Sequence, residues 1–177
     1  MRVELFTNIG PVPYTESQRD QWRDRTLGRQ WMQRYEAELP LYFNAECRRF
    51  VEKNGQVKRA FGFFETLGAI VLYHATGYLP LDSTSSFVFP VKEENAVVEG
   101  LMAPNLLRLI RNHSTELGNT QAPDTLMYKP NLKDWFFCDS KGPTDSLDKN
   151  PNQRKKFEQI AEMSGKPVRL LHFKSMG

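Results

Sequence analysis

The feature that most constrains the fold is a short aromatic segment in the last third of the chain. Residues 135–140 read Trp-Phe-Phe-Cys-Asp-Ser, and the apolar residues follow one another without the alternation of a half-exposed strand. Aromatic runs of this length favour a β-strand. A strand that is apolar on both sides belongs to a sheet whose two faces are covered, usually by helices. We therefore expect a small β-sheet that is flanked by helices on both faces.

The residues around this segment predict the order of the neighbouring elements. A strand is expected at 125–128, and a turn with Pro130 and Asn131 joins it to the aromatic strand as a hairpin. Asn150-Pro151 indicates the start of a helix that runs to Gly165, because proline suits the first helical position. A final strand is expected at 168–173. The fold class is thus α/β, or α+β-like, with a small mixed sheet.

The first two thirds of the sequence are mainly helical by pattern. The segment 57–76 is apolar on most sides and ends at Gly77, which predicts a buried central helix. The other expected elements are an extended lead-in over 1–14, a helix from Thr15 to Tyr35, a helix from Pro40 to a stop signal at Asn54-Gly55, a short strand at 87–89, and a helix over 93–111 that is broken near Pro104.

Composition limits the function classes only weakly. With 177 residues the chain is long enough for one domain with additions, and its formal net charge of +3 permits an anionic partner without requiring one. Cys47 and Cys138 lie far apart, so they predict free buried thiols and neither a zinc site nor a disulfide framework. No secretion signal or membrane span is recognisable, so we expect a cytoplasmic protein without a membrane partner, and export by a leaderless route stays open.

Two acids and a lysine at the expected hairpin have the spacing of a phosphodiester-cleaving site. Pro123-Asp124 opens one strand, and Asp139-Ser140-Lys141 closes the other. Side chains alternate along a strand, so Asp139 and Lys141 should point to the same face. Carboxylate oxygens suit hard cations such as Mg²⁺, and such cations offset charge on a reacting phosphate. We expect Asp139 to hold the metal, while Lys141 orients or deprotonates water.

The stretch from 122 to 173 also resembles a known nuclease group. It contains Pro-Asp at 123–124, Asp-Ser-Lys at 139–141, then Gly142-Pro143, Asp145, Leu147 and Gln153 in that order. This order resembles the virus-type replication-repair nuclease group (VRR-NUC) of the PD-(D/E)XK, or restriction-endonuclease-like, superfamily. The group usually has a glutamate where this chain has Asp139. The resemblance implies a restriction-endonuclease-like core and a Mg²⁺- or Mn²⁺-dependent nuclease with Asp124 and Asp139 as metal ligands.

The same superfamily commonly places a glutamate on the helix before the sheet. Glu65, followed by Gly68, Leu72 and Gly77-Tyr78, fits this pattern and becomes a predicted third metal ligand. An acid on an otherwise apolar helix is costly to bury unless it is paired or bound to a cation, which independently singles out Glu65. We expect residues 1–55 to form an N-terminal helical extension and residues 56–177 the nuclease-like domain.

Other polar residues near the motif allow two interpretations. Gln153 is a predicted catalytic residue by resemblance, or part of a capping box that reaches back to the Asn150 amide. Asp145 most simply stabilises a turn. The arginines from Arg19 to Arg34 alternate with acids, which favours a solvated helix face, and the three histidines lack metal-ligand spacing. The predicted nucleic-acid-binding residues are Lys149, Arg154, Lys155 and Lys156.

Two functions remain open from the residues. The first is a nuclease that hydrolyses DNA in repair, in phage or mobile-element biology, or as an antibacterial toxin with an immunity protein as partner. The alternative is a catalytically inactive nucleic-acid-binding or assembly protein with a nuclease fold. Asp139→Ala and Lys141→Ala should leave folding largely intact. Removing a carboxylate from a metal cluster relieves repulsion between acids, so Asp139→Ala should preserve or raise the melting temperature of the metal-free protein.

Overall fold

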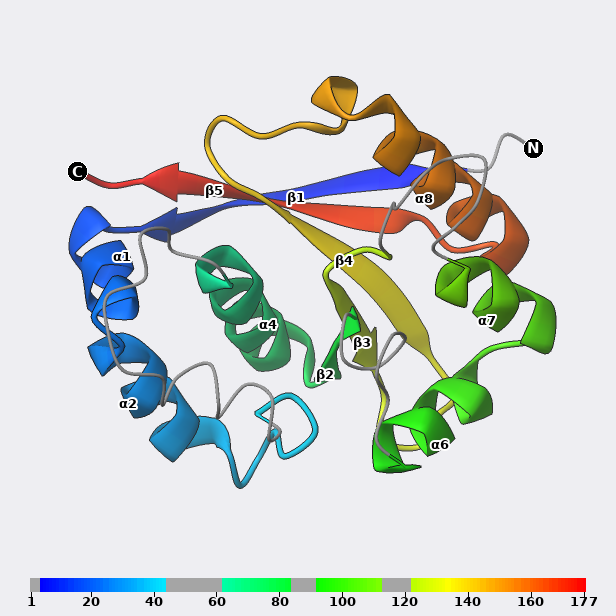
Figure 1. Ribbon diagram of the computed structural model, residues 1–177, viewed down its shortest axis with the longest axis horizontal. Helices are drawn as coiled ribbons and strands as arrows, with labels where there is room; N and C mark the ends of the chain where they lie inside the picture. Colours follow the sequence, from blue (N-terminus) through cyan, green and yellow to red (C-terminus); the bar gives the residue numbers. More distant parts are fainter. Residues whose placement is uncertain (1–3, 44–61, 84–91, 113–121) are drawn as a thin grey trace.

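The computed structural model describes residues 4–43, 62–83, 92–112 and 122–177. These residues form a mixed α/β fold, in which helices flank a five-stranded sheet (Figure 1), as expected. The strands are β1 (Phe6–Tyr14), β2 (Leu79–Asp82), β3 (Thr125–Tyr128), β4 (Trp135–Lys141) and β5 (Val168–Ser175). The α-helices are α1 (Glu16–Arg23), α2 (Thr26–Tyr35), α4 (Phe63–Thr76), α6 (Lys92–Leu101), α7 (Pro104–Arg111) and α8 (Pro151–Ser164), and η1 (Leu147–Lys149) is a 3₁₀ turn.

The sheet combines antiparallel and parallel strands in the order β1-β5-β4-β3-β2. β2, β3 and β4 form an antiparallel meander, and the hairpin between β3 and β4 confirms the sequence prediction. β5 then pairs with β4 in parallel, and β1 pairs with β5 in parallel. A parallel pair needs a crossover connection, and α8 provides it between β4 and β5. The start of α8 is therefore brought back beside the end of β4.

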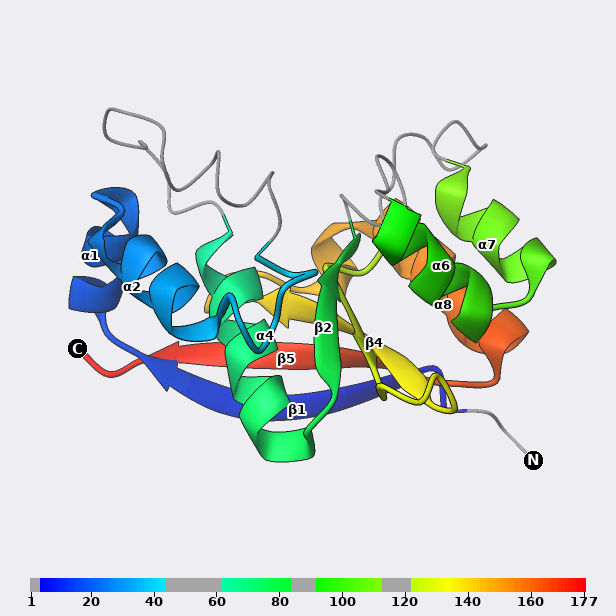
Figure 2. The same cartoon turned by 90° about the horizontal axis from the view of Figure 1, so that it is seen from below.

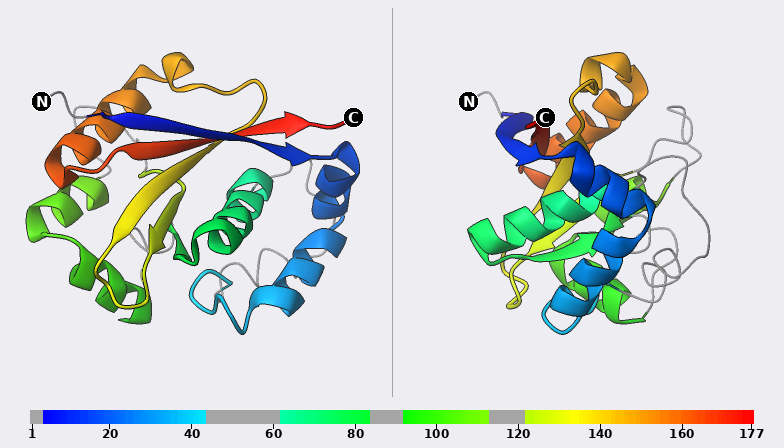
Figure 3. Two further views of the ribbon diagram at one scale, coloured as in Figure 1. Left: turned by 180° about the vertical axis from the view of Figure 1, so that it is seen from behind. Right: turned by 90° about the vertical axis from the view of Figure 1, so that its left-hand side faces the viewer.

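Both faces of the sheet are covered, which explains the unbroken aromatic run. Trp135 and Phe137 of β4 pack with residues of α6, α7 and α8. Phe136 and Cys138 point the other way and pack with residues of α1 and α4. Figures 1 and 3 show α1, α2 and α4 gathered at one end of the molecule and α6, α7 and α8 at the other. The prediction of a doubly covered sheet is confirmed.

Two predicted helix boundaries are confirmed by their chemistry. The central apolar helix is α4, and it ends at Gly77, whose φ of 72° lies in the left-handed region that glycine adopts without strain. The helix expected over 93–111 is divided into α6 and α7, with Pro104 in the first turn of α7. Proline lacks the N–H that an uninterrupted helix would need at this position.

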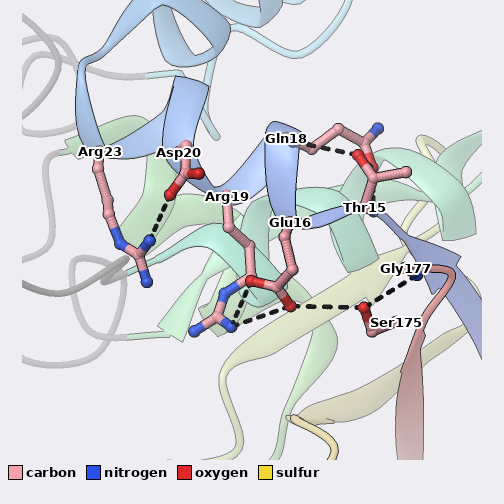
Figure 4. Close-up of polar contacts among 8 residues, drawn as sticks. All are labelled: Thr15, Glu16, Gln18, Arg19, Asp20, Arg23, Ser175 and Gly177. Carbon is pink, nitrogen blue, oxygen red and sulfur yellow. Dashed lines mark hydrogen bonds and ion pairs between the residues drawn. The ribbon is translucent and has the colours of Figure 1, made fainter.

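The helix expected from Thr15 to Tyr35 is broken into α1 and α2. Thr15 caps α1 as predicted, in a capping box with Gln18 (Figure 4). The break falls at Arg25, whose φ of 71° is left-handed, and the Asp24 carboxylate accepts a hydrogen bond from the Thr26 N–H beyond it. Hydrophobic periodicity continues across the break, so the sequence pattern does not reveal it.

The two arginines of α1 are partly exposed and paired with acids, as expected, but Arg25, which follows α1, is buried against the same expectation. Figure 4 shows Arg19 beside Glu16 and Arg23 beside Asp20, each pair being one helical turn apart. Glu16 also accepts a hydrogen bond from the Ser175 hydroxyl, which joins α1 to the end of β5. These cations are therefore already paired with acids.

Two strands were not recognised in the sequence. The lead-in over 1–14 contains edge strand β1, whose Pro11 and Pro13 are tolerated because one side of the strand pairs with no other strand among the described residues. β2 is only four residues long and includes Pro80, which suits the opposite edge. The second expected helix does not begin at Pro40, because residues 40–43 form turns. Residues 44–53 of that helix, the strand at 87–89 and the domain division at 55 lie outside the described residues. None of the described helices has the length and apolar composition needed to cross a bilayer.

The turn of the β3–β4 hairpin is tied to the start of β5 by Asp134. Its carboxylate accepts hydrogen bonds from the Tyr78 hydroxyl and from the Lys166 ammonium at 2.7 Å. The Lys166 hydrogen bond, followed by that of Tyr78, lowers the pKa of Asp134 from 3.8 to about 2. This network closes the end of the sheet that is remote from Lys141.

We predict that Asp134→Asn destabilises the protein in a pH-dependent way. A carboxyl group whose pKa is lowered by folding contributes stability above its unfolded value, and this is lost as the pH falls toward 2. Asp134 and Lys166 are about 40% exposed, so solvent screening reduces the contribution to about 1 kcal/mol. Urea denaturation at pH 7 should show the loss, and wild type and variant should converge near pH 2. Equal stability at pH 7 would contradict the assignment.

Candidate active site

The predicted site residues lie at the ends of neighbouring elements. Asp124 directly precedes β3, Asp139 and Lys141 end β4, and Glu65 lies in the first turn of α4. The start of α4 and the end of β2 lie on the same side of the molecule in Figure 2. Charge interactions link Glu65, Asp124 and Asp139 to one another. The fold thus brings together acids that are up to 74 residues apart in the sequence.

Asp139 and Lys141 form a buried ion pair. The Lys141 Nζ lies 2.5 Å from Asp139 Oδ2, and the side chains of Lys141 and Asp139 are only 3% and 1% exposed. Both residues point to the same face of β4, as strand alternation predicts. Two charges buried this deeply are tolerated because each neutralises the other.

Backbone hydrogen bonds hold both aspartates at the mouth of the hairpin. The Ser140 N–H donates to Asp124 Oδ2 at 2.8 Å, and the Asp124 N–H donates to Asp139 Oδ1 at 3.3 Å. Each carboxylate therefore reaches across from one strand to the backbone of the other. This reciprocal contact fixes the separation of the two acids through the β3–β4 register.

Gln153 completes the surroundings of Lys141. Its side-chain oxygen accepts a hydrogen bond from Lys141 Nζ at 3.2 Å, while its backbone N–H donates to the Asn150 side chain at 3.1 Å. Asn150 thus caps α8, but the glutamine side chain turns to the lysine rather than back to the Asn150 amide. Asp145 lies 3.6 Å from Lys141 Nζ and is 54% exposed, so it adds a second, weaker charge partner.

Close packing of α4 against β4 brings Glu65 to the acids. A Cβ atom on Gly68 would lie 2.9 Å from a methyl group of Leu171 and 3.2 Å from the Ser140 hydroxyl, so a larger residue would force these side chains to shift. The Ser140 hydroxyl donates to the Phe64 carbonyl at 3.4 Å. A Cβ atom on Gly142 would similarly lie 3.1 Å from the Phe64 ring. The helix is therefore seated directly on the end of β4.

The pKa values show that the acids are electrostatically frustrated. Burial, then the charges of Asp139 and Glu65, raise the pKa of Asp124 well above its usual value. Burial also raises the pKa of Asp139 and of Glu65, and Lys141 only partly opposes this for Asp139. Burial alone lowers the pKa of Lys141, but Asp139 more than offsets this, so its pKa is raised. Lys141 is therefore an ammonium group at neutral pH.

Asp82 is a neighbouring acid that sequence reasoning missed. It ends β2, pairs with Thr125 in the sheet register, and its charge raises the pKa of Glu65. The only sequence signal is an acid after a short apolar run, and it is recognisable only once Leu79–Asp82 is known to be a strand. Asp145, which also raises the pKa of Glu65, was assigned to a turn.

The chemistry of the donors suits a hard cation. The buried Asp139 Oδ2 receives no hydrogen bond from the part of the chain that the structure describes, apart from its ion-pair contact with Lys141. Asp124 and Glu65 supply further carboxylate oxygens with raised pKa values, which a divalent cation would relieve. Within the described ranges, no three Asp, Glu, His or Cys side chains are close enough to form a ready metal cluster.

The predicted nucleic-acid contacts are only partly accessible. The prediction for Lys156 is wrong, because this residue is 1% exposed and its ammonium donates to the Ile110 carbonyl at 3.4 Å. The sequence Arg-Lys-Lys at 154–156 indicates a basic patch, and it does not reveal that the third residue faces the inside of the helix bundle. Arg154 pairs with Asp148 and Glu158, and the Lys149 ammonium donates to the Thr144 carbonyl. Lys155 is exposed.

The ion pair reverses the expected effect of removing Asp139. Asp139→Ala leaves the Lys141 ammonium buried without its nearest partner, so we predict a loss of about 3 kcal/mol in the free energy of unfolding. The double variant Asp139→Ala/Lys141→Met removes both charges and should recover at least half of this loss. Urea denaturation in EDTA measures both. A single variant as stable as wild type would show that the pair does not form.

Asp124→Asn should instead preserve or raise stability in the absence of metal. A carboxyl group whose pKa is higher in the folded than in the unfolded state favours folding at low pH, and this advantage is lost as the pH rises from 3.8 through the folded value. At pH 8 the asparagine keeps an acceptor for Ser140 but removes a repelled charge, so the melting temperature should rise by about 2–4 °C.

Melting curves in EDTA between pH 4 and pH 8 check this prediction. The difference between Asp124→Asn and wild type should shrink as the pH falls, because wild-type Asp124 becomes protonated. A variant that melts below wild type at every pH would show that the Asp124 charge stabilises the fold.

Comparison with known proteins returns no match of the chain to a family model, to a curated protein or to a solved structure.

Proposed function

We propose that this chain is a metal-dependent nuclease that hydrolyses DNA phosphodiester bonds. The observation that carries the proposal is the convergence of Asp124, Asp139 and Lys141 at one end of the β3–β4 hairpin, with Gln153 on Lys141. The order helix, antiparallel strands, helix and parallel strand around them is compatible with the PD-(D/E)XK resemblance drawn from the motif. The convergence also explains why four separated polar residues occur around an otherwise apolar sheet.

The residues divide the chemistry between them. Asp124, Asp139 and Glu65 provide oxygen ligands, and a bound Mg²⁺ or Mn²⁺ would supply positive charge and a more acidic water. The raised pKa of Lys141 suits an ammonium that orients water and stabilises negative charge on the phosphate, rather than a base that removes a proton. Gln153 keeps this ammonium directed toward the acids. Removing either Asp139 or Lys141 therefore disables the site.

The alternative is a nucleic-acid-binding or assembly protein without turnover. The observation in its favour is the contact between Lys141 and Asp139, because the lysine occupies an oxygen that a metal would need. A cation must displace this contact before the site is complete. Activity measurements separate the two functions.

We predict that the wild-type protein nicks supercoiled plasmid DNA with Mg²⁺ or Mn²⁺ and not in EDTA. Asp139→Asn keeps the size of the side chain, and Lys141→Gln removes the positive charge with a side chain about one atom shorter. Each should lower the nicking rate at least about 100-fold, the usual effect of losing an electrostatic group at a reacting centre. Gel electrophoresis of the plasmid over time measures the rate.

Asp148→Asn is the matched control, because it removes an acid that is 81% exposed and paired with Arg154. Its rate should stay within about twofold of wild type, since surface pairs contribute little. Absence of nicking with either metal, or full activity of both site variants, would reject the nuclease and leave the binding protein.

A further inference from the structure

A polar strip continues from the candidate site across β5. Strand register pairs Asp139 with Leu170 and Lys141 with His172, so these residues are neighbours in adjacent strands. Val168 and Leu170 are buried in the core cluster that includes Phe157 of α8. Farther along β5, His172 is only partly buried and Lys174 is exposed. The covered apolar face of β5 therefore becomes an open polar one beside Lys141.

Edge strand β1 adds a hydrogen-bonded asparagine to this strip. His172 Nε2 lies 2.8 Å from Asn8 Oδ1, and because an amide oxygen only accepts, the imidazole nitrogen donates. The Asn8 side chain is exposed, and its amide nitrogen has no hydrogen-bond partner among the described residues. Figures 1 and 3 show β1 and β5 side by side, extending beyond α8 toward the C-terminus. The strip thus presents a fixed N–H donor.

Lys174 supplies an unpaired positive charge two residues beyond His172. Alternation places both on the same face, about 6.6 Å apart along the strand. Lys174 has no ion pair within the described ranges, in contrast to Arg154, which has two acid partners, and Arg19, which has one. Arg154 of α8 and Arg19 of α1 are therefore already neutralised by acids, whereas the ammonium group of Lys174 at the end of β5 is not.

The Asn8 amide N–H₂ and the Lys174 ammonium lie near the buried pair of Asp139 and Lys141. Both groups donate hydrogen bonds, so they suit a ligand rich in phosphate oxygens. We propose that Asn8 and Lys174 bind the sugar–phosphate backbone of the DNA strand that enters the site, with His172 as the positioning residue for Asn8. This inference rests on the proposed nuclease function. It assigns DNA binding to β1 and β5, whereas the residues predicted from the sequence lie in η1 and α8.

Fluorescence anisotropy with a labelled 20-base-pair duplex in EDTA tests the proposal without cleavage. Lys174→Ala should weaken binding about 3- to 10-fold at 0.1 M salt and reduce the slope of log affinity against log salt by about 0.9, because one counterion release is lost. Asn8→Ala should weaken binding without changing the slope, because the amide is neutral. His172→Ala should match Asn8→Ala, and His172→Gln should restore binding through its side-chain N–H.

Lys133→Ala is the matched control, since Lys133 is an exposed cation in the hairpin turn at the other end of β4. It should change neither affinity nor slope. If the wild-type protein nicks plasmid, but Lys174→Ala and Asn8→Ala both bind DNA with wild-type affinity and salt slope, the proposed binding strip is wrong. The proposed nuclease function would not be affected. A wild-type protein that neither nicks nor binds DNA would reject the proposed function and the strip with it.

Discussion

The structure depends on one buried ion pair at the end of its central strand. Asp139 and Lys141 are both nearly inaccessible to water, and each is acceptable there only because the other is within 2.5 Å. The pair also organises its neighbours: the lysine receives Gln153 from α8, and the aspartate receives a backbone N–H from the residue before β3. Three elements therefore meet at a point that would otherwise be an unpaired charge in an apolar sheet. Stability and the proposed chemistry draw on the same two side chains.

Around this pair the protein keeps acids that oppose folding at neutral pH. Burial and repulsion by neighbouring acids raise the pKa of Asp124 and Glu65, which means that their ionised forms are held at a cost. A purely structural cluster would have little reason to retain them, since apolar residues would pack more favourably. Such clusters are typical of functional sites, where a bound cation relieves the repulsion. The repulsion between these buried acids is the main physical argument for the proposed metal-dependent reaction.

The arrangement of positive charge shows why position along a chain is a poor guide to a binding surface. Arg154 and Lys156 follow the motif closely, yet the first is paired with acids and the second is buried. Lys174 lies 33 residues beyond Lys141 in sequence but only one strand away in the sheet. The parallel pairing of β5 with β4 brings Lys174 near Lys141. The place of Lys174 beside the site is therefore found through strand register and not through proximity in the sequence.

The sequence by itself determined the elements whose signals are local. An unbroken aromatic run indicates a doubly covered strand, Gly77 and Pro104 mark helix boundaries, and the alternation of Asp139 and Lys141 places them on one face. Only the tertiary structure decided which distant elements meet. Packing and strand pairing determine that α4 lies on β4 and that Asp82 belongs to β2. They also determine that Gln153 contacts Lys141 and not the Asn150 amide. These contacts join residues far apart in the chain, and no short-range pattern records them.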